Sequence, residues 1–190
     1  MSTSTRHAVG METLEVDRAG WRAWLEAHAA DTAEVWLLVP RGGRGITHTE
    51  AVEEALCFGW IDSLSRSHSD QARVQRFSPR NPKAAWSTIN RAAAERLIAE
   101  GRMAPAGLAM VEHAKATGTW LLLADAQAGI VPADLRAALD AVPAAAEHFA
   151  AFPPSARRVG LEAVALAKRP ETRAARIARI VDRAARGERP

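Results

Sequence analysis

The polar side chains best placed to do chemistry lie between residues 60 and 90 of this 190-residue chain. Acidic, basic, amide and hydroxyl groups alternate there with tryptophans, and together such groups can hold an anionic group against an aromatic face. The candidate ligand-binding residues are Trp60, Asp62, Arg76, Ser78, Arg80, Lys83, Trp86 and Asn90. The sequence thus predicts a site for a small anionic ligand or a protein partner.

Asp62 and Arg80 form the central pair of this set. If two strands pair around a turn between them, the carboxylate and the guanidinium come close enough for a bidentate contact. Such a contact would either fix the hairpin to the preceding helix or, together with Arg76 and Lys83, leave a basic group to hold an anion. Both interpretations stay open on the sequence alone.

No catalytic residue is assigned from the sequence. The serines of this stretch lie outside any Gly-x-Ser-x-Gly elbow, and neither His48 nor His68 has an orienting acid that the sequence makes evident. The six histidines never occur at metal-ligand spacing, and the single cysteine, Cys57, excludes cysteine-cluster metal sites. We therefore expect no metal, no cofactor and a binding protein, with an enzyme acting on a small anionic substrate as an alternative.

Charge and hydropathy narrow the class of protein further. The net charge is only +3, and no apolar run approaches the length of a membrane span. The first residues lack the apolar segment of a secretory signal, so we expect a cytoplasmic protein. Basic residues become denser near the C-terminus and include Arg169, Arg173 and Arg176. A second hypothesis is that these three arginines form a nucleic-acid or phospho-ligand interface. The alternative is that they lie on a solvated helix face.

Apolar periodicity and capping signals predict the elements that position these residues. Asp17 is a helix N-cap, Thr47 and Glu50 have capping-box spacing, and Gly59 ends the helix that they open. The predicted strands are 11–16, 34–39, 60–66 and 73–77. The predicted helices are 17–28, 47–58, 86–100, 105–117, 132–141, 144–152, 155–168 and 170–186.

The fold class that follows is α+β: a small antiparallel sheet with packed helices, followed by a C-terminal all-helical module. The expected domains are a disordered N-terminus over residues 1–9, an α+β domain over 10–125 and a helical module over 126–190.

Several motifs carry a family resemblance. The run Ala51-Val52-Glu53-Glu54-Ala55-Leu56-Cys57-Phe58-Gly59-Trp60-Ile61-Asp62 is similar to the signature of the YdeI/OmpD-associated family, also called bacteriocin-protection proteins. Motifs that follow in the same order are Arg76-Phe77-Ser78-Pro79-Arg80, Trp86-Ser87, Ile89-Asn90, residues 97–103 and residues 105–108. Residues 167–173 and Arg176-Ile177 resemble the helical C-terminal module of that family. The similarity extends from about residue 12 to residue 187.

This resemblance implies a stress or antimicrobial-peptide protection protein that acts by binding rather than by catalysis, without a cofactor. A cationic peptide toxin would be poorly matched by a chain of net charge +3, which favours an indirect role over direct sequestration.

Overall fold

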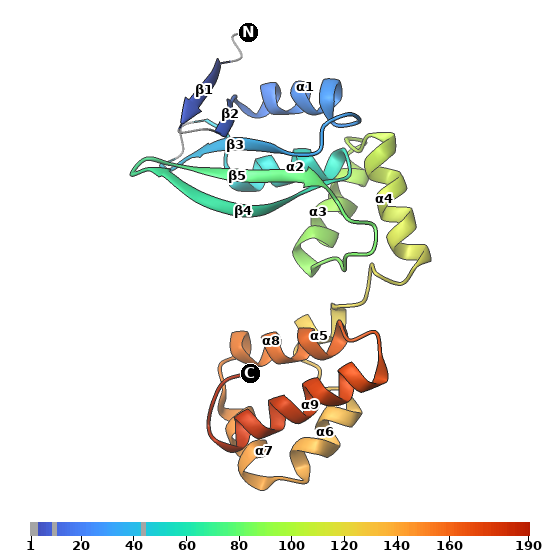
Figure 1. Cartoon of the computed structure of the whole chain (residues 1–190). Coiled ribbons are helices and arrows are strands. Elements are labelled where there is room, and N and C mark those ends of the chain that lie inside the picture. Colours follow the sequence, from blue (N-terminus) through green and yellow to red (C-terminus); the bar gives the residue numbers. More distant parts are fainter. Residues whose placement is uncertain (1–3, 9–10, 43–44) are drawn as a thin grey trace. The chain divides into compact units, whose positions relative to one another are not determined.

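A computed structural model describes residues 4–8, 11–42 and 45–190 of the chain (Figure 1). The chain forms two compact units. The first contains the described residues up to 84 together with 89–116, and the second contains residues 85–88 and 117–190. Each unit has a hydrophobic core of its own. The predicted domain limits, 10–125 and 126–190, stay a prediction.

The first unit is built on a five-stranded sheet with the strand order β1-β2-β3-β5-β4. The strands are β1 (Ser4–Ala8), β2 (Met11–Glu15), β3 (Val35–Pro40), β4 (Trp60–Ser69) and β5 (Ala72–Pro79). The α+β class is confirmed, but the sheet is mixed because β2 and β3 run parallel. Helix α1 (Arg18–His28) connects these two strands and returns the chain in the same direction, as a parallel pair requires.

The N-terminal segment differs from the sequence-based expectation. Residues 4–8, predicted to be disordered, form β1 and pair antiparallel with β2. Their pairing supplies the edge strand on that side of the sheet. Residues 1–3 and 9 of the predicted disordered segment lie outside the described residues.

Two helices cover one face of this sheet and enclose the first core. Trp21 of α1 is fully buried, its ring centroid lies 5.2 Å from that of Phe77 in β5, and its indole N–H donates to Ala51 O at 3.0 Å. Ala51 belongs to α2 (His48–Cys57), which begins with the predicted capping box of Thr47 and Glu50. The N-cap at Asp17 is confirmed as well, since its carboxylate accepts from Gly20 N at 2.8 Å.

The end of α2 is tightly packed against α4 (Pro105–Ala116), which follows α3 (Thr88–Ala99). Gly59 has a φ of 75°, the left-handed conformation predicted for the residue that ends this helix. Ala104 N donates to Cys57 O at 3.0 Å, and Arg80 N donates to Gly59 O at 2.9 Å. Gly107 lies so close that a Cβ built on it would be 2.3 Å from Cys57 O. The junction between α2 and β4 is therefore held by backbone contacts from two directions.

The second unit contains the helices α5 (Ala124–Gln127), α6 (Ala133–Asp140), α7 (Pro143–Ala151), α8 (Pro154–Ala165) and α9 (Pro170–Ala185). Prolines occupy the first turn of α7, α8 and α9, where the missing N–H costs no helical hydrogen bond. Helix α9 packs against α6, α7 and α8. Leu135, Leu139 and Leu161 are among the fully buried side chains of the core between them. Within the described residues, no helix combines the length and apolar character of a membrane span.

Replacing Gly107 by alanine should destabilise the first unit. In a helix interior, glycine is normally less favourable than alanine by about 0.5–1 kcal/mol. Here the added methyl group would overlap Cys57 O, and α4 would have to move, so we expect a loss of about 2 kcal/mol in the free energy of unfolding, measured by urea denaturation.

Gly160→Ala is the control for this substitution, because the nearest atoms to its added Cβ belong to the side chain of Pro190, at 3.0 Å, rather than to backbone. We expect a smaller change there. Unchanged or raised stability of Gly107→Ala would contradict the close packing of α4 on the end of α2.

Candidate functional site

Three of the predicted ligand-binding residues are buried in the fold. Trp60 is 1% exposed, and its indole N–H donates to Ala29 O at 3.2 Å. Arg80 is 5% exposed, and its burial lowers its pKa to about 10. Trp86 belongs to the second unit, where its ring centroid lies 4.9 Å from that of Trp120. Trp60 and Trp86 thus pack as core aromatics.

Asp62 pairs with a histidine rather than with Arg80. Its Oδ2 lies 2.9 Å from His48 Nε2, and Gln75 Nε2 donates to the same oxygen at 3.5 Å. The register of the hairpin pairs Asp62 with Phe77 and Trp60 with Pro79, so Arg80 follows the last of these pairs and lies beside Gly59. The predicted Asp62–Arg80 contact is therefore replaced by an Asp62–His48 contact.

This pair links the start of α2 to the edge strand β4. The side chains of His48 and Asp62 are 38% and 26% exposed, so both reach solvent. A carboxylate that contacts an imidazole orients the ring, which is the arrangement used in general-base catalysis. Sequence reasoning missed the pair because the two residues lie 14 positions apart in the sequence. They come together only because the first turn of α2 lies next to β4 in the fold.

Arg76 lies on the opposite face of the sheet from Asp62. Asp62 is paired across the strands with Phe77, and the side chain before Phe77 in a strand points the other way. The Arg76 guanidinium donates to Glu34 Oε2 from Nε at 2.9 Å and to Ser63 Oγ at 3.4 Å. The hydrogen bonds from Arg76 lower the pKa of Glu34. Asp62 and Arg76 therefore cannot hold one small anion together.

The other members of the predicted set are more accessible: Ser78 and Asn90 are half-buried and Lys83 is exposed. Ser78 shares the face of Arg76, two positions along β5. The assignment of this set to ligand binding stays a prediction. Among the described residues, no group of three or more His, Cys, Asp or Glu side chains is arranged to hold a metal ion.

A cluster of ion pairs that the sequence analysis missed joins α1, α2 and the segment after α3. The carboxylate of Glu54 is 2% exposed and accepts from Arg18 Nε at 2.7 Å, from Arg22 at 2.9 Å and from Arg102. Burial acts to raise the pKa of Glu54, but the hydrogen bonds from Arg18 and Arg22 and the charge of Arg102 lower it overall. The negative charge of the buried Glu54 carboxylate is thus compensated by three arginines of the same unit.

Two of the three C-terminal arginines also have internal partners. Arg173 makes a bidentate contact with Asp134, at 2.6 and 2.9 Å, and donates to Val164 O at 3.2 Å. Arg176 donates to Ala163 O. These carbonyls lie in the last turn of α8, the end of a helix that favours positive charge. Arg169 is exposed, and the nucleic-acid assignment of the three arginines stays a prediction.

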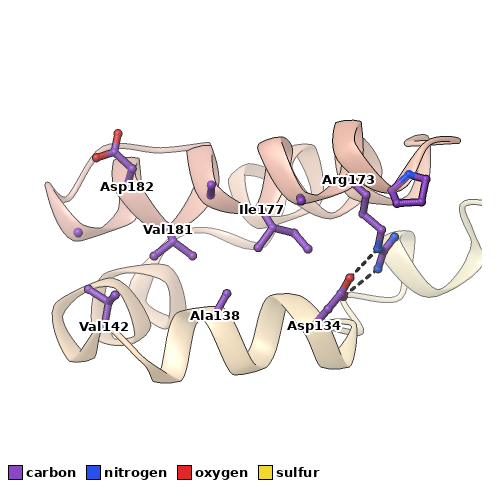
Figure 2. A pocket seen from close by; sticks show the side chains of 11 residues that line it. Asp134, Ala138, Val142, Arg173, Ile177, Val181 and Asp182 are labelled. Atoms are coloured by element: carbon purple, nitrogen blue, oxygen red, sulfur yellow. Dashed lines mark hydrogen bonds and ion pairs between the residues drawn. The ribbon is translucent and has the colours of Figure 1, made fainter.

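The second unit contains a groove between α6 and α9 with a volume of about 770 Å³. Figure 2 shows that Ile177 and Val181 of α9 point toward Ala138 of α6 and toward Val142, which follows α6. The Arg173–Asp134 ion pair lies at one end of the groove. Asp182 lies at the other end, where it accepts from Arg186 at 2.7 Å. The groove is therefore apolar along its middle and charged at both ends.

Two known families match different parts of the chain. Residues 14–110, about half of the chain, match the family described as Domain of unknown function (DUF8412). Residues 128–187 match the family described as Bacteriocin-protection, YdeI or OmpD-Associated. The chain belongs to the DUF8412 family, and its helical C-terminal region is similar to the bacteriocin-protection, YdeI- or OmpD-associated family. No curated protein and no solved structure matches the chain.

The predicted resemblance is confirmed, with a narrower extent. The bacteriocin-protection match covers the helical module, which contains every residue that lines the α6–α9 groove. The run from Ala51 to Asp62, quoted above as that family's signature, lies instead within the DUF8412 match. Sequence reasoning missed the groove, because neither α6 nor α9 alone shows that their apolar sides leave a hollow between them.

The Glu54 cluster gives a prediction for stability and pH. Glu54→Gln should lower the free energy of unfolding at neutral pH by about 2 kcal/mol, since it removes the charge-assisted hydrogen bonds that this buried carboxylate accepts from three partly exposed arginines. The pKa of Glu54 is lowered in the folded chain, so its contribution is present above the unfolded value and is lost as the pH falls below about 4.5. Denaturation of both proteins between pH 7 and pH 3 should therefore show a difference that shrinks in acid.

The matched control is Glu26→Gln, because Glu26 is exposed and pairs with the same Arg22 at 3.3 Å. A loss of about 0.5 kcal/mol or less is expected there. Equally small losses for the two substitutions, or a Glu54 effect that persists unchanged at pH 3, would contradict a stabilising role for the buried carboxylate.

Proposed function

We propose that this chain protects cells against bacteriocins by binding rather than by catalysis, that it acts in the cytoplasm, and that the α6–α9 groove is its binding surface. The observation that carries the proposal is the position of the groove, which lies entirely within the residues that match the bacteriocin-protection family. An apolar, open groove on that domain gives a partner a surface from which water can be displaced.

The shape of the groove suits a helical segment. Helix α9 forms one wall along its 16 residues, a length of about 24 Å at 1.5 Å per residue. A partner helix of about four turns would cover this length and could place apolar side chains at positions i, i+3 and i+4 along it. Ile177, Val181, Val142 and the alanines around them supply the apolar contacts.

The local charge of the groove also admits a cationic partner. The net charge of +3 argued against direct binding of a cationic peptide, but this charge belongs to the whole chain. The charged side chains that line the groove are Asp134, Arg173 and Asp182, two acidic and one basic. A cationic amphipathic helix therefore meets no excess of positive charge in the groove.

A synthetic peptide of about 16 residues, with leucine on one helical face and lysine on the other, should bind the full chain with micromolar affinity, as is typical of small interfaces. Fluorescence anisotropy of the labelled peptide measures this affinity. Ala174→Arg places a long side chain on the exposed wall of the groove and should weaken binding at least about 10-fold. Ala175→Arg, the matched control, adds the same charge at an exposed alanine of α9 that does not line the groove.

A scrambled peptide of the same composition controls for charge alone. Equal affinity for the scrambled peptide, an equal loss in both arginine variants, or no binding at millimolar concentration would contradict peptide binding in the groove.

A further inference from the structure

We infer that a second copy of this chain covers the groove when no peptide is bound, with the two α9 helices side by side and antiparallel. The proposal concerns regulation of the groove and in that respect rests on the proposed function, whereas the self-association itself is independent of it. It is carried by a self-complementary pattern along α9.

The α9 residues that line the groove are arranged symmetrically about a point between Ile177 and Ala178. In a two-fold antiparallel pair of helices, a residue before this point meets the residue at the same distance after it in the other copy. All eight lining residues of α9 then find a lining residue of the partner: Pro170 with Ala185, Arg173 with Asp182, Ala174 with Val181, and Ile177 with Ala178. No lining residue of α9 is left over.

The sizes of the paired side chains are complementary. Val181, which is partly exposed, would meet the partner's Ala174, and the 8% of Ile177 that is exposed would meet the partner's Ala178, so each larger side chain faces an alanine. Ala174 and Ala178 are exposed in the single chain, which leaves room for these side chains to approach. The two-fold axis repeats each contact, so four apolar contacts of this kind form along the seam.

The charges select this alignment. Arg173 would lie opposite the partner's Asp182, and each of these residues already has an ion-pair partner in its own chain, Asp134 for Arg173 and Arg186 for Asp182. The four side chains would then alternate in sign across the interface, and the row would occur twice. A parallel alignment would instead bring like charges together, and a shift by one helical turn would separate Arg173 from the partner's Asp182.

The small size of the interface makes the association reversible. One face of a 16-residue helix, about 24 Å long, forms the centre of the contact. Interfaces of this size lie at the weak end of specific association. A peptide and a second copy would occupy the same groove, so each should displace the other.

Sedimentation velocity of the full chain without peptide tests the dimer between about 5 and 500 μM, the range in which weak interfaces associate. We expect the mass to rise from 20.5 kDa toward twice that value. Ala178→Arg, at the centre of the contact, and Asp182→Arg, which opposes the partner's Arg173, should each raise the dissociation constant at least about 10-fold.

Two matched variants serve as controls. Ala175→Arg is an exposed alanine of the same helix, and Asp140→Arg makes the same charge change at an exposed residue of α6; neither residue lines the groove. Both should leave the dissociation constant unchanged. Circular dichroism of each variant confirms that it is folded.

A mass of 20.5 kDa at every concentration, or equal weakening by Ala178→Arg and Ala175→Arg, would overturn the proposed dimer. Dissociation of the dimer by the leucine–lysine peptide would support the regulatory role. If the variants weaken the dimer as expected but the peptide does not dissociate it, the self-association stands and its regulatory role is overturned. Failure of the peptide to bind even to the monomeric Asp182→Arg and parent proteins at low concentration would count against the proposed function alone.

Discussion

The first unit depends on the compensation of one buried charge. A carboxylate removed from water, as Glu54 is, would destabilise the fold by several kcal/mol if it lacked partners. Arg18 and Arg22 come from α1, and Arg102 comes from the segment after α3, so the same contacts that compensate the charge also fix these elements on α2. The position of α2 in turn places His48 beside Asp62 and presses the end of the helix against Gly107. The Asp62–His48 contact is thus a consequence of how α2 is held.

Local features of the first unit could be predicted from the sequence, and features that depend on topology could not. The caps at Asp17 and Thr47 and the left-handed Gly59 were predictable because the groups involved lie within a few residues of one another. The parallel pairing of β2 with β3 and the contact between Asp62 and His48 join segments that are far apart in the sequence, so local patterns do not predict them. Helical periodicity likewise located α3 but not its covered side: Ile89 is 81% exposed, because a period alone does not say which side of a helix is covered.

In the second unit, the sequence predicted the helices but not the contacts between them. The arginines of α9 resembled a phosphate-binding face, yet Arg173 reaches Asp134, 39 positions earlier, and Arg176 reaches the end of α8. The groove arises from the same arrangement, since it lies where α9 meets α6. The proposed peptide and the proposed second copy would both use this apolar surface. In the stretch around Asp62, the Asp62–His48 contact reaches solvent, and Asp62 lies on the opposite face of the sheet from Arg76 and Ser78.

We propose that the chain binds its partner through the α6–α9 groove and not through residues 60–90. The most direct test is a backbone NMR titration of the labelled full chain with the leucine–lysine peptide, at concentrations where the chain is monomeric. We expect chemical-shift changes concentrated on α6 and α9, including the amides of Ala138, Ala174 and Val181, with those of Asp62 and Arg76 unchanged. Changes concentrated at Asp62 and Arg76, with α9 unaffected, would contradict it.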